Sequence, residues 1–296
     1  MKKFIYQLLF FAFQFALVPL LLFVSFTHAS KRQAEAWTLP PSINKVVIGD
    51  SRIQMAVNES LLYGTKNLSL GSESFFYSFY KFQHLLKKNK QIYTLLLGVS
   101  YHSFSAYYYD FTYHPDVAQR YFFILPLRAQ LRLLMNVENP FKLLMKSFTI
   151  SYKNLRGQNN FSFLGGFSTH ATDLPLSCES IENRIYAQFY SKKKLREISS
   201  LNAEYFSKIK ILCAKKKVKL IALNSPMHPE YAQGVPKKFR DTYDSLVARQ
   251  GITVIDFNEL VLNDKDFLPD GDHLTIGGAN KATLYLKNKL SRNIEK

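Results

Sequence analysis

A serine follows the first strongly apolar run of the chain, in the stretch VVIGDSR that extends from Val46 to Arg52. Branched apolar residues are typical of a buried strand, and the glycine after them allows a tight turn that presents Ser51 at the strand end. A serine hydroxyl is a weak nucleophile unless a neighbouring base accepts its proton, and that base needs an acid to orient it. Ser51 is therefore a candidate nucleophile if the chain supplies both partners, and otherwise part of an ordinary turn.

Both partners occur near the C-terminus, in the stretch FLPDGDHLTIGGANKATLYL at residues 267–286. Asp270 and His273 are three residues apart in a loop with proline and glycine that leads into a helical pattern. His273 would accept the proton of Ser51, and Asp270 would hold the other ring nitrogen. Asp272 is an alternative orienting acid, whereas Asp256 fits a loop or helix-capping residue better than a catalytic one.

Five apolar runs are typical of strands, and three of them lack alternation, as expected for strands covered on both faces. The expected strands are residues 44–50, 66–70, 92–99, 218–224 and 252–257. The expected helices are residues 72–90, 194–216, 236–250 and Gly277 to about Leu290. This alternation predicts a three-layer α/β/α domain with a doubly wound, parallel, five-stranded sheet in flavodoxin-like order. Ligands of such sheets bind at the carboxyl ends of the strands, where Ser51 stands.

Residues 101–190 interrupt the alternation between the third and fourth expected strands. They contain an aromatic tract from Tyr101 to Tyr113, a helical stretch, and a loop rich in Gly, Asn and Ser at 156–173. Because this segment is too long for a minimal crossover, we expect an inserted helical cap on the ligand side of the sheet. The expected organisation is an anchor at 1–30, a tether at 31–43, and an α/β domain at 44–296 that includes the cap.

The end motifs GDSR and DGDHLTIGGA resemble those of the SGNH, or GDSL-type, hydrolase superfamily, and the likeness extends in order over residues 44–290. In that family the serine of the first block is the nucleophile, and the Asp and His of a terminal D-x-x-H are its partners. The resemblance therefore implies catalytic roles for Ser51, Asp270 and His273. The family's oxyanion hole uses the backbone N–H of the serine and of a glycine after the second strand, which implies Ser51 and Gly71.

The third block of the family, G-x-N-D, is altered in this chain. The stretch LLGVSYH places Ser100 where the family has Asn and Tyr101 where it has Asp. A hydroxyl donates one hydrogen bond, so Ser100 is the expected substitute, although loss of an oxyanion donor typically lowers the rate by about 10²–10³-fold. This departure resembles extracytoplasmic members linked to polysaccharide O-acetylation, which tend to have one N-terminal anchor.

Four further residues are candidates for substrate binding. Arg52 follows the nucleophile, His228 follows the fourth expected strand, and Tyr101 and His102 open the aromatic tract. Aromatic rings with hydroxyl groups stack well on sugars, although packing within the cap would also explain the tract.

Residues 4–26 contain no charged side chain and are long enough to cross a membrane as a helix. The apolar run exceeds the core of a usual signal peptide, which favours an uncleaved anchor, although cleavage after Ala29 is the alternative. Lysines and arginines flank both ends, so the positive-inside rule orients this helix weakly. In either case we expect the bulk of the chain to lie outside the cytoplasm, in the periplasm or at the cell surface.

The formal net charge of +17 favours anionic partners, meaning phospholipid head groups, acidic glycans or nucleic acid. Nucleic acid is the least supported of these, because no RNA-binding motif occurs in the sequence. We find no zinc-ligand spacing and no phosphate-binding glycine loop, so no metal and no cofactor are expected. Cys178 and Cys213 are the only cysteines, and they are either a disulfide or two small buried side chains.

These observations predict a membrane-anchored enzyme of the cell envelope that forms an acyl intermediate on Ser51. With a sugar hydroxyl as acceptor it is an O-acetyltransferase of a polysaccharide, and with water it is an esterase. A transferase needs an acyl donor outside the cell, and the resemblance implies an integral-membrane acyltransferase as partner. The alternative is a catalytically weakened, glycan-binding or scaffold subunit of a polysaccharide modification or export complex.

Overall fold

The larger of the two sheets in the described part of the chain has five parallel strands in the order β2-β1-β3-β6-β7. The computed structural model describes residues 2–35, 38–155, 165–169 and 174–292. The strands are β1 Lys45–Ile48, β2 Thr65–Asn67, β3 Thr94–Gly98, β6 Lys219–Asn224 and β7 Thr253–Asp256. This confirms the predicted fold class and strand order, and each strand lies within or one residue outside its expected range.

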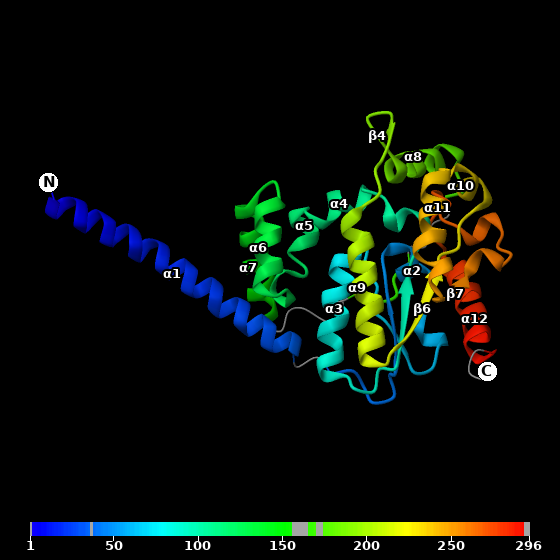
Figure 1. Ribbon diagram of the computed structural model, residues 1–296, viewed down its shortest axis with the longest axis horizontal. Helices are drawn as coiled ribbons and strands as arrows, with labels where there is room; N and C mark the ends of the chain where they lie inside the picture. The colour runs from blue at the N-terminus through cyan, green and yellow to red at the C-terminus, as the bar shows by residue number, and fades with distance from the viewer. Residues whose placement is uncertain (1, 36–37, 156–164, 170–173, 293–296) are drawn as a thin grey trace. The chain divides into compact units, whose positions relative to one another are not determined.

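Helices cover both faces of this sheet. On one face, α3 Phe75–Lys88 and α9 Ser200–Lys216 pack against each other in front of the strands in Figure 1. On the other, α2 Ser51–Ala56 and α12 Ile276–Arg292 pack together, and their apolar residues join those of β1, β3, β6 and β7 in one buried cluster. The central strand β3 is buried at every residue, as expected for a strand without alternation.

The insertion between β3 and β6 is mostly helical. Its α-helices are α4 Tyr107–Thr112, α5 Pro115–Ala118, α6 Leu127–Asn136, α7 Pro140–Leu155 and α8 Cys178–Phe189. After it come the hairpin β4 Tyr190–Ser191 and β5 Lys194–Leu195, where a helix from residue 194 was expected. Most of the expected 156–173 loop lies outside the described residues. Between β6 and β7 lie the α-helices α10 Pro229–Gly234 and α11 Lys237–Leu246.

The chain divides into two compact units. One contains the sheet and comprises Thr38–Tyr113 and Phe161–Lys296; the other comprises Met1–Trp37 and His114–Asn160. The segment expected as one cap, 101–190, is thus shared between the units. Within the second unit, helix α1 Lys2–Glu35 packs against α7.

Helix α1 contains one candidate membrane span, Lys2–Ser25, with a mean hydropathy of 2.4. This stretch is long and apolar enough to cross a membrane or to act as a signal sequence. The helix continues to Glu35, so it includes residues that were expected in the tether.

Cys178 and Cys213 do not form a disulfide. Cys178 is exposed at the start of α8, whereas Cys213 is buried in α9. Burial raises the pKa of the Cys213 thiol to about 12, as expected for a small apolar side chain in the core.

Candidate active site

Ser51, His273 and Asp270 form a hydrogen-bonded chain. The Ser51 Oγ atom lies 2.8 Å from Nε2 of His273, and Nδ1 of His273 lies 2.6 Å from Oδ2 of Asp270. The two ends of the sequence meet here because β1 and the loop before α12 both reach the carboxyl edge of the sheet. The geometry is that of a nucleophile, a base and an orienting acid.

The turn between β1 and α2 presents Ser51. Asp50 caps α2 by accepting a hydrogen bond of 3.0 Å from the backbone N–H of Arg52. The other oxygen of Asp50 accepts from the Tyr108 hydroxyl and lies 2.9 Å from Nε2 of His102. Burial alone would raise the pKa of Asp50, but the hydrogen bond from His102 holds it well below its ordinary value. The residue before Ser51 is therefore a fixed, ionised cap.

The loop that carries His273 is fixed by its own backbone. Oδ1 of Asp270 accepts hydrogen bonds of 3.1 Å from the N–H groups of Asp272 and His273, and Gly271 has a φ of +61°. A left-handed conformation suits glycine, so this residue makes the tight loop possible. Burial acts to raise the pKa of Asp270, but the hydrogen bond and the charge of His273, together with the backbone N–H of Asp272, hold this pKa below its ordinary value. Asp270 is thus ionised and has both oxygens engaged.

Asp272, the alternative orienting acid, has other partners. Its carboxylate pairs with the guanidinium of Arg52, accepts from Nε of Arg184 at 2.6 Å, and accepts from Nε2 of Gln188 at 2.8 Å. Burial would raise the pKa of Asp272, but the two guanidinium groups hold it far below its ordinary value. Asp272 therefore joins its own loop to α2 and α8, while Asp270 is the carboxylate that is hydrogen-bonded to the ring of His273 among the described residues.

A pocket of about 330 Å³ opens next to the Ser51–His273 pair. Its lining combines hydroxyl groups, apolar side chains and one guanidinium. The lining residues are Ser51, Met55, Ser72, Tyr107, Tyr108, Arg184, Leu268, Asp270 and His273. Such a mixture suits a small polar ester that is held by a few directed hydrogen bonds.

The predicted oxyanion hole is not open in this structure. The backbone N–H of Gly71 donates to Oε1 of Gln54 at 2.9 Å, so a side chain occupies the position expected for a substrate oxygen. Ser100 is 3 % exposed, its N–H donates to Ser103 Oγ at 3.0 Å, and it is not among the described lining residues of the pocket. Gly71 lies close to the nucleophile, because a Cβ atom added to it would stand 3.8 Å from Ser51 Cβ. Of the expected oxyanion donors, Ser100 thus lies outside the pocket lining, and the N–H of Gly71 is near Ser51 but engaged by Gln54.

Arg52 and His102, which were expected to contact substrate, are instead buried against internal acidic partners. Each residue is 1 % exposed. Arg52 pairs with Asp272, and His102 bonds to Asp50. Both residues pack behind the turn that carries Ser51.

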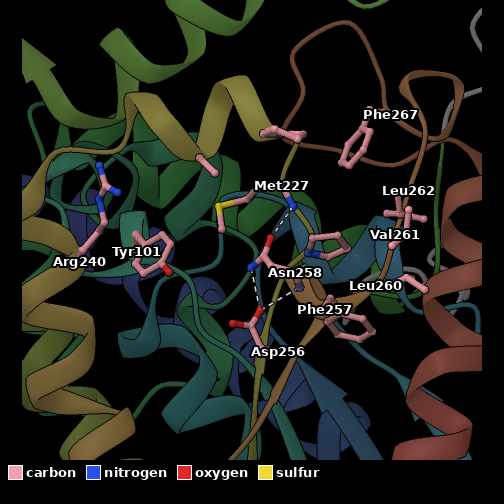
Figure 2. A pocket seen from close by; sticks show the side chains of 13 residues that line it. Tyr101, Met227, Arg240, Asp256, Phe257, Asn258, Leu260, Val261, Leu262 and Phe267 are labelled. Atoms are coloured by element: carbon pink, nitrogen blue, oxygen red, sulfur yellow. Dashed lines mark hydrogen bonds between the residues drawn. The ribbon is translucent and has the colours of Figure 1, made fainter.

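Tyr101 and His228 do not line the pocket beside Ser51. Tyr101 lines a second pocket of about 440 Å³, in which Asp256 and Asn258 are joined by hydrogen bonds (Figure 2). His228 caps α10, and its Nε2 lies 3.3 Å from Oδ1 of Asp264. The capping role expected for Asp256 is confirmed, since it caps the short helix that begins at Phe257.

Arg184, Tyr107 and Ser72 are pocket residues that the sequence did not reveal. Arg184 lies in α8, a stretch without a motif, and only its approach to Asp272 brings it to the site. Tyr107 belongs to the aromatic tract in which Tyr101 and His102, rather than Tyr107, were the expected substrate contacts. Ser72 has a φ of +65°, which is uncommon for a residue with a side chain and occurs at functional sites.

Asp270, Asp272 and His273 are close enough to hold a metal ion, since one ligand atom of each lies within 4.8 Å of the others. Each of them, however, already has a strong partner within the chain. The hydrogen bond of His273 to Ser51 and the ion pairs of Asp272 account for this cluster without a metal.

Comparisons with known proteins add little to this geometry. An uncharacterised family matches residues 182–295, a range that includes His273 but not Ser51. No curated protein matches this chain. A solved structure provisionally described as a platelet activating factor from Streptococcus pneumonia is similar at 13% identity, covering 95% of this chain and 98% of its own, with a TM-score of 0.41. At this TM-score the similarity carries no functional argument, so the function must be argued from the site.

Proposed function

We propose that this protein is a serine-dependent acyl-transfer enzyme with Ser51 as nucleophile, His273 as base and Asp270 as orienting acid. The observation that supports this proposal most is the continuous chain of hydrogen bonds from Ser51 through His273 to Asp270, at 2.8 and 2.6 Å. Its position at the carboxyl edge of a parallel sheet, beside a pocket, is where such sheets bind ligands.

In the proposed reaction, Ser51 Oγ attacks the ester carbonyl while its proton passes to Nε2 of His273. The tetrahedral intermediate then collapses, His273 gives the proton to the leaving alkoxide, and the acyl group remains on Ser51. Asp270 holds Nδ1–H of His273, which fixes the tautomer and stabilises the imidazolium form. An acceptor hydroxyl then gives its proton to His273 and takes the acyl group, which restores Ser51.

The acceptor is proposed to be a sugar hydroxyl, which makes the protein an O-acetyltransferase of an envelope polysaccharide, or water, which makes it an acetylesterase. The apolar helix at the N-terminus supports a membrane anchor, with the catalytic unit on the extracytoplasmic side. A transferase in that position would take its acyl group from an integral-membrane acyltransferase, because soluble acyl donors are intracellular. This assignment of substrate and partner depends on the family resemblance of the two end motifs.

A fluorophosphonate probe tests the proposal directly, because it labels activated serines. The full-length protein should be labelled and should hydrolyse a chromogenic acetyl ester, and Ser51→Ala should abolish both. Ser72→Ala is the matched control, since Ser72 lines the same pocket but has no histidine partner among the described residues. Labelling that survives in Ser51→Ala and disappears in Ser72→Ala would identify Ser72 as the nucleophile and contradict the proposal.

Two features of the expected oxyanion hole favour a second candidate, a glycan-binding or scaffold subunit that has lost catalysis. Gln54 occupies the N–H of Gly71, and Ser100 does not reach the pocket. If neither wild type nor variants react with the probe or the ester, this second function is the better explanation.

A further inference from the structure

Arg184 brings a positive charge into the catalytic pocket. It lies on α8, in the insertion, and it lines the pocket together with Ser51, His273 and Tyr107. Its side chain is 22 % exposed, whereas that of Arg52, the other arginine of this cluster, is 1 % exposed. Arg184 is therefore the guanidinium that a ligand in the pocket can reach.

The contacts of Arg184 leave part of its guanidinium available. Nε donates to Asp272 at 2.6 Å, and Nη1 approaches the Tyr107 hydroxyl at 3.5 Å. Among the described residues these are its side-chain hydrogen bonds, and a guanidinium has five N–H donors. Asp272 fixes one edge of the group, so the orientation is set before a ligand arrives.

The acidic groups near Arg184 are already paired. Oδ1 of Asp270 accepts from two backbone N–H groups and Oδ2 from His273, so Asp270 is used within the loop. Asp272 is shared between two guanidinium groups, those of Arg52 and Arg184. Arg184 thus presents a positive charge to the pocket. Its carboxylate partner among the described residues, Asp272, is shared with Arg52.

We propose that Arg184 binds an oxyanionic group, a carboxylate or a phosphate, on the ester that Ser51 attacks. The substrate class would then be acyl esters of acidic compounds, such as a sugar that carries a carboxylate, rather than neutral esters. A guanidinium binds such groups through two parallel N–H bonds, which also fixes the orientation of the ligand. This inference rests on the proposed function, because it names the substrate of the same site.

Matched aryl esters test the proposal by kinetics. The probes are 4-acetoxybenzoate, 4-acetoxyphenyl phosphate and the neutral 4-acetoxybenzamide, which differ in the group opposite the acetyl ester. We expect the wild type to prefer an anionic ester by about 10–100-fold in kcat/KM, mainly through KM. In Arg184→Gln this ratio should fall to near one whatever the absolute rate, and Arg184→Lys should retain part of it. The carboxylate and the phosphate probes distinguish the two sources of negative charge.

Arg196→Gln is the matched control, because Arg196 stacks on the ring of Tyr107 from outside the pocket lining and pairs with Asp110. It removes the same charge from the protein, yet it should keep the preference. An unchanged preference in Arg184→Gln, or no preference in the wild type, would overturn the proposal.

A binding measurement separates this inference from the proposed chemistry. In Ser51→Ala the esters are not expected to turn over, so dissociation constants can be measured by calorimetry with the full-length protein in detergent. Binding of 4-acetoxybenzoate about 10–100-fold tighter than the amide, lost on adding Arg184→Gln, supports the anion site even if Ser51 proves not to be the nucleophile. Equal affinity for both probes, or no binding of either, refutes the anion site independently of the kinetics.

Discussion

Asp270 and Asp272 belong to one short loop, but their environments give them different roles. Asp270 accepts from the ring of His273, whereas Asp272 is buried and pairs with Arg52 and Arg184. The sequence favoured Asp270 and kept Asp272 as an alternative, because both residues are near enough to His273 to orient it. The distances decide in favour of Asp270.

Replacing Asp272 should affect stability more than replacing Asp270. Asp272→Asn removes the negative charge between two guanidinium groups, one of them fully buried, and should lower the free energy of unfolding by about 3–5 kcal/mol. Asp270→Asn should instead lower kcat by about 10⁴-fold, because the wrong tautomer of His273 is held. Urea unfolding and ester hydrolysis of both variants measure this contrast. Equal effects on stability would mean that the Asp272 charge is not needed by the fold.

Gln54 controls access to the N–H of Gly71. If Gly71 stabilises the oxyanion, this hydrogen bond must break during the reaction, at a net cost of about 1 kcal/mol. Gln54→Ala should then raise kcat/KM for a neutral acetyl ester by up to about fivefold. A fall in kcat/KM of about 10-fold or more in the same assay would instead identify the Gln54 amide as a donor to the substrate. Thermal unfolding of the variant excludes a loss of structure.

At the level of elements, the contact between α2 and the sheet places Ser51. A Cβ atom on Gly98 would lie 2.4 Å from Cγ1 and 3.0 Å from Cβ of Ile53, and one on Gly49 would lie 3.2 Å from Cα of Gly98. The two glycines therefore let α2 lie directly over β1 and β3. The strand–turn–helix unit could be predicted from VVIGDSR, but this close approach could not.

Gly98→Ala should displace α2 and the nucleophile with it. Overpacking of this kind typically costs about 1–3 kcal/mol of stability, and a shift of Ser51 should also lower kcat. Ile53→Ala removes Cγ1, the atom closest to the added methyl group. The double variant Gly98→Ala/Ile53→Ala should therefore lose less stability and less kcat than the sum of the losses in the two single variants. Strict additivity of the two substitutions would contradict the contact.

At the scale of the whole molecule, stability should depend on pH through His102. Burial, followed by the charge of Arg52, lowers the pKa of His102 from 6.5 to about 4. Between these two values the unfolded chain binds more protons than the folded one, so stability is present above pH 6.5 and is lost as the pH falls towards 4. The loss should approach about 3 kcal/mol.

Urea unfolding of the full-length protein across this pH range measures the loss. The variant His102→Gln keeps a donor for Asp50 but cannot titrate, so the difference between its pH profile and that of the wild type isolates His102. A wild-type profile that matches the variant would contradict the lowered pKa. At lower pH, protonation of Asp50 should destabilise both proteins, because its pKa is also depressed in the folded state.

The sequence by itself determined the alternation of strands and helices, the apolar N-terminal segment, and the candidate pair Ser51 and His273 with two possible carboxylates beside it. These features depend on local patterns: continuous apolar runs make buried strands, and short motifs stand at strand ends. Only the tertiary structure decided which of two neighbouring carboxylates faces His273, that Arg52 and His102 are buried, and that Arg184 reaches the pocket. These outcomes depend on side chains from separate elements that compete for the same hydrogen-bond partners. Local sequence patterns do not predict which of these side chains will pair.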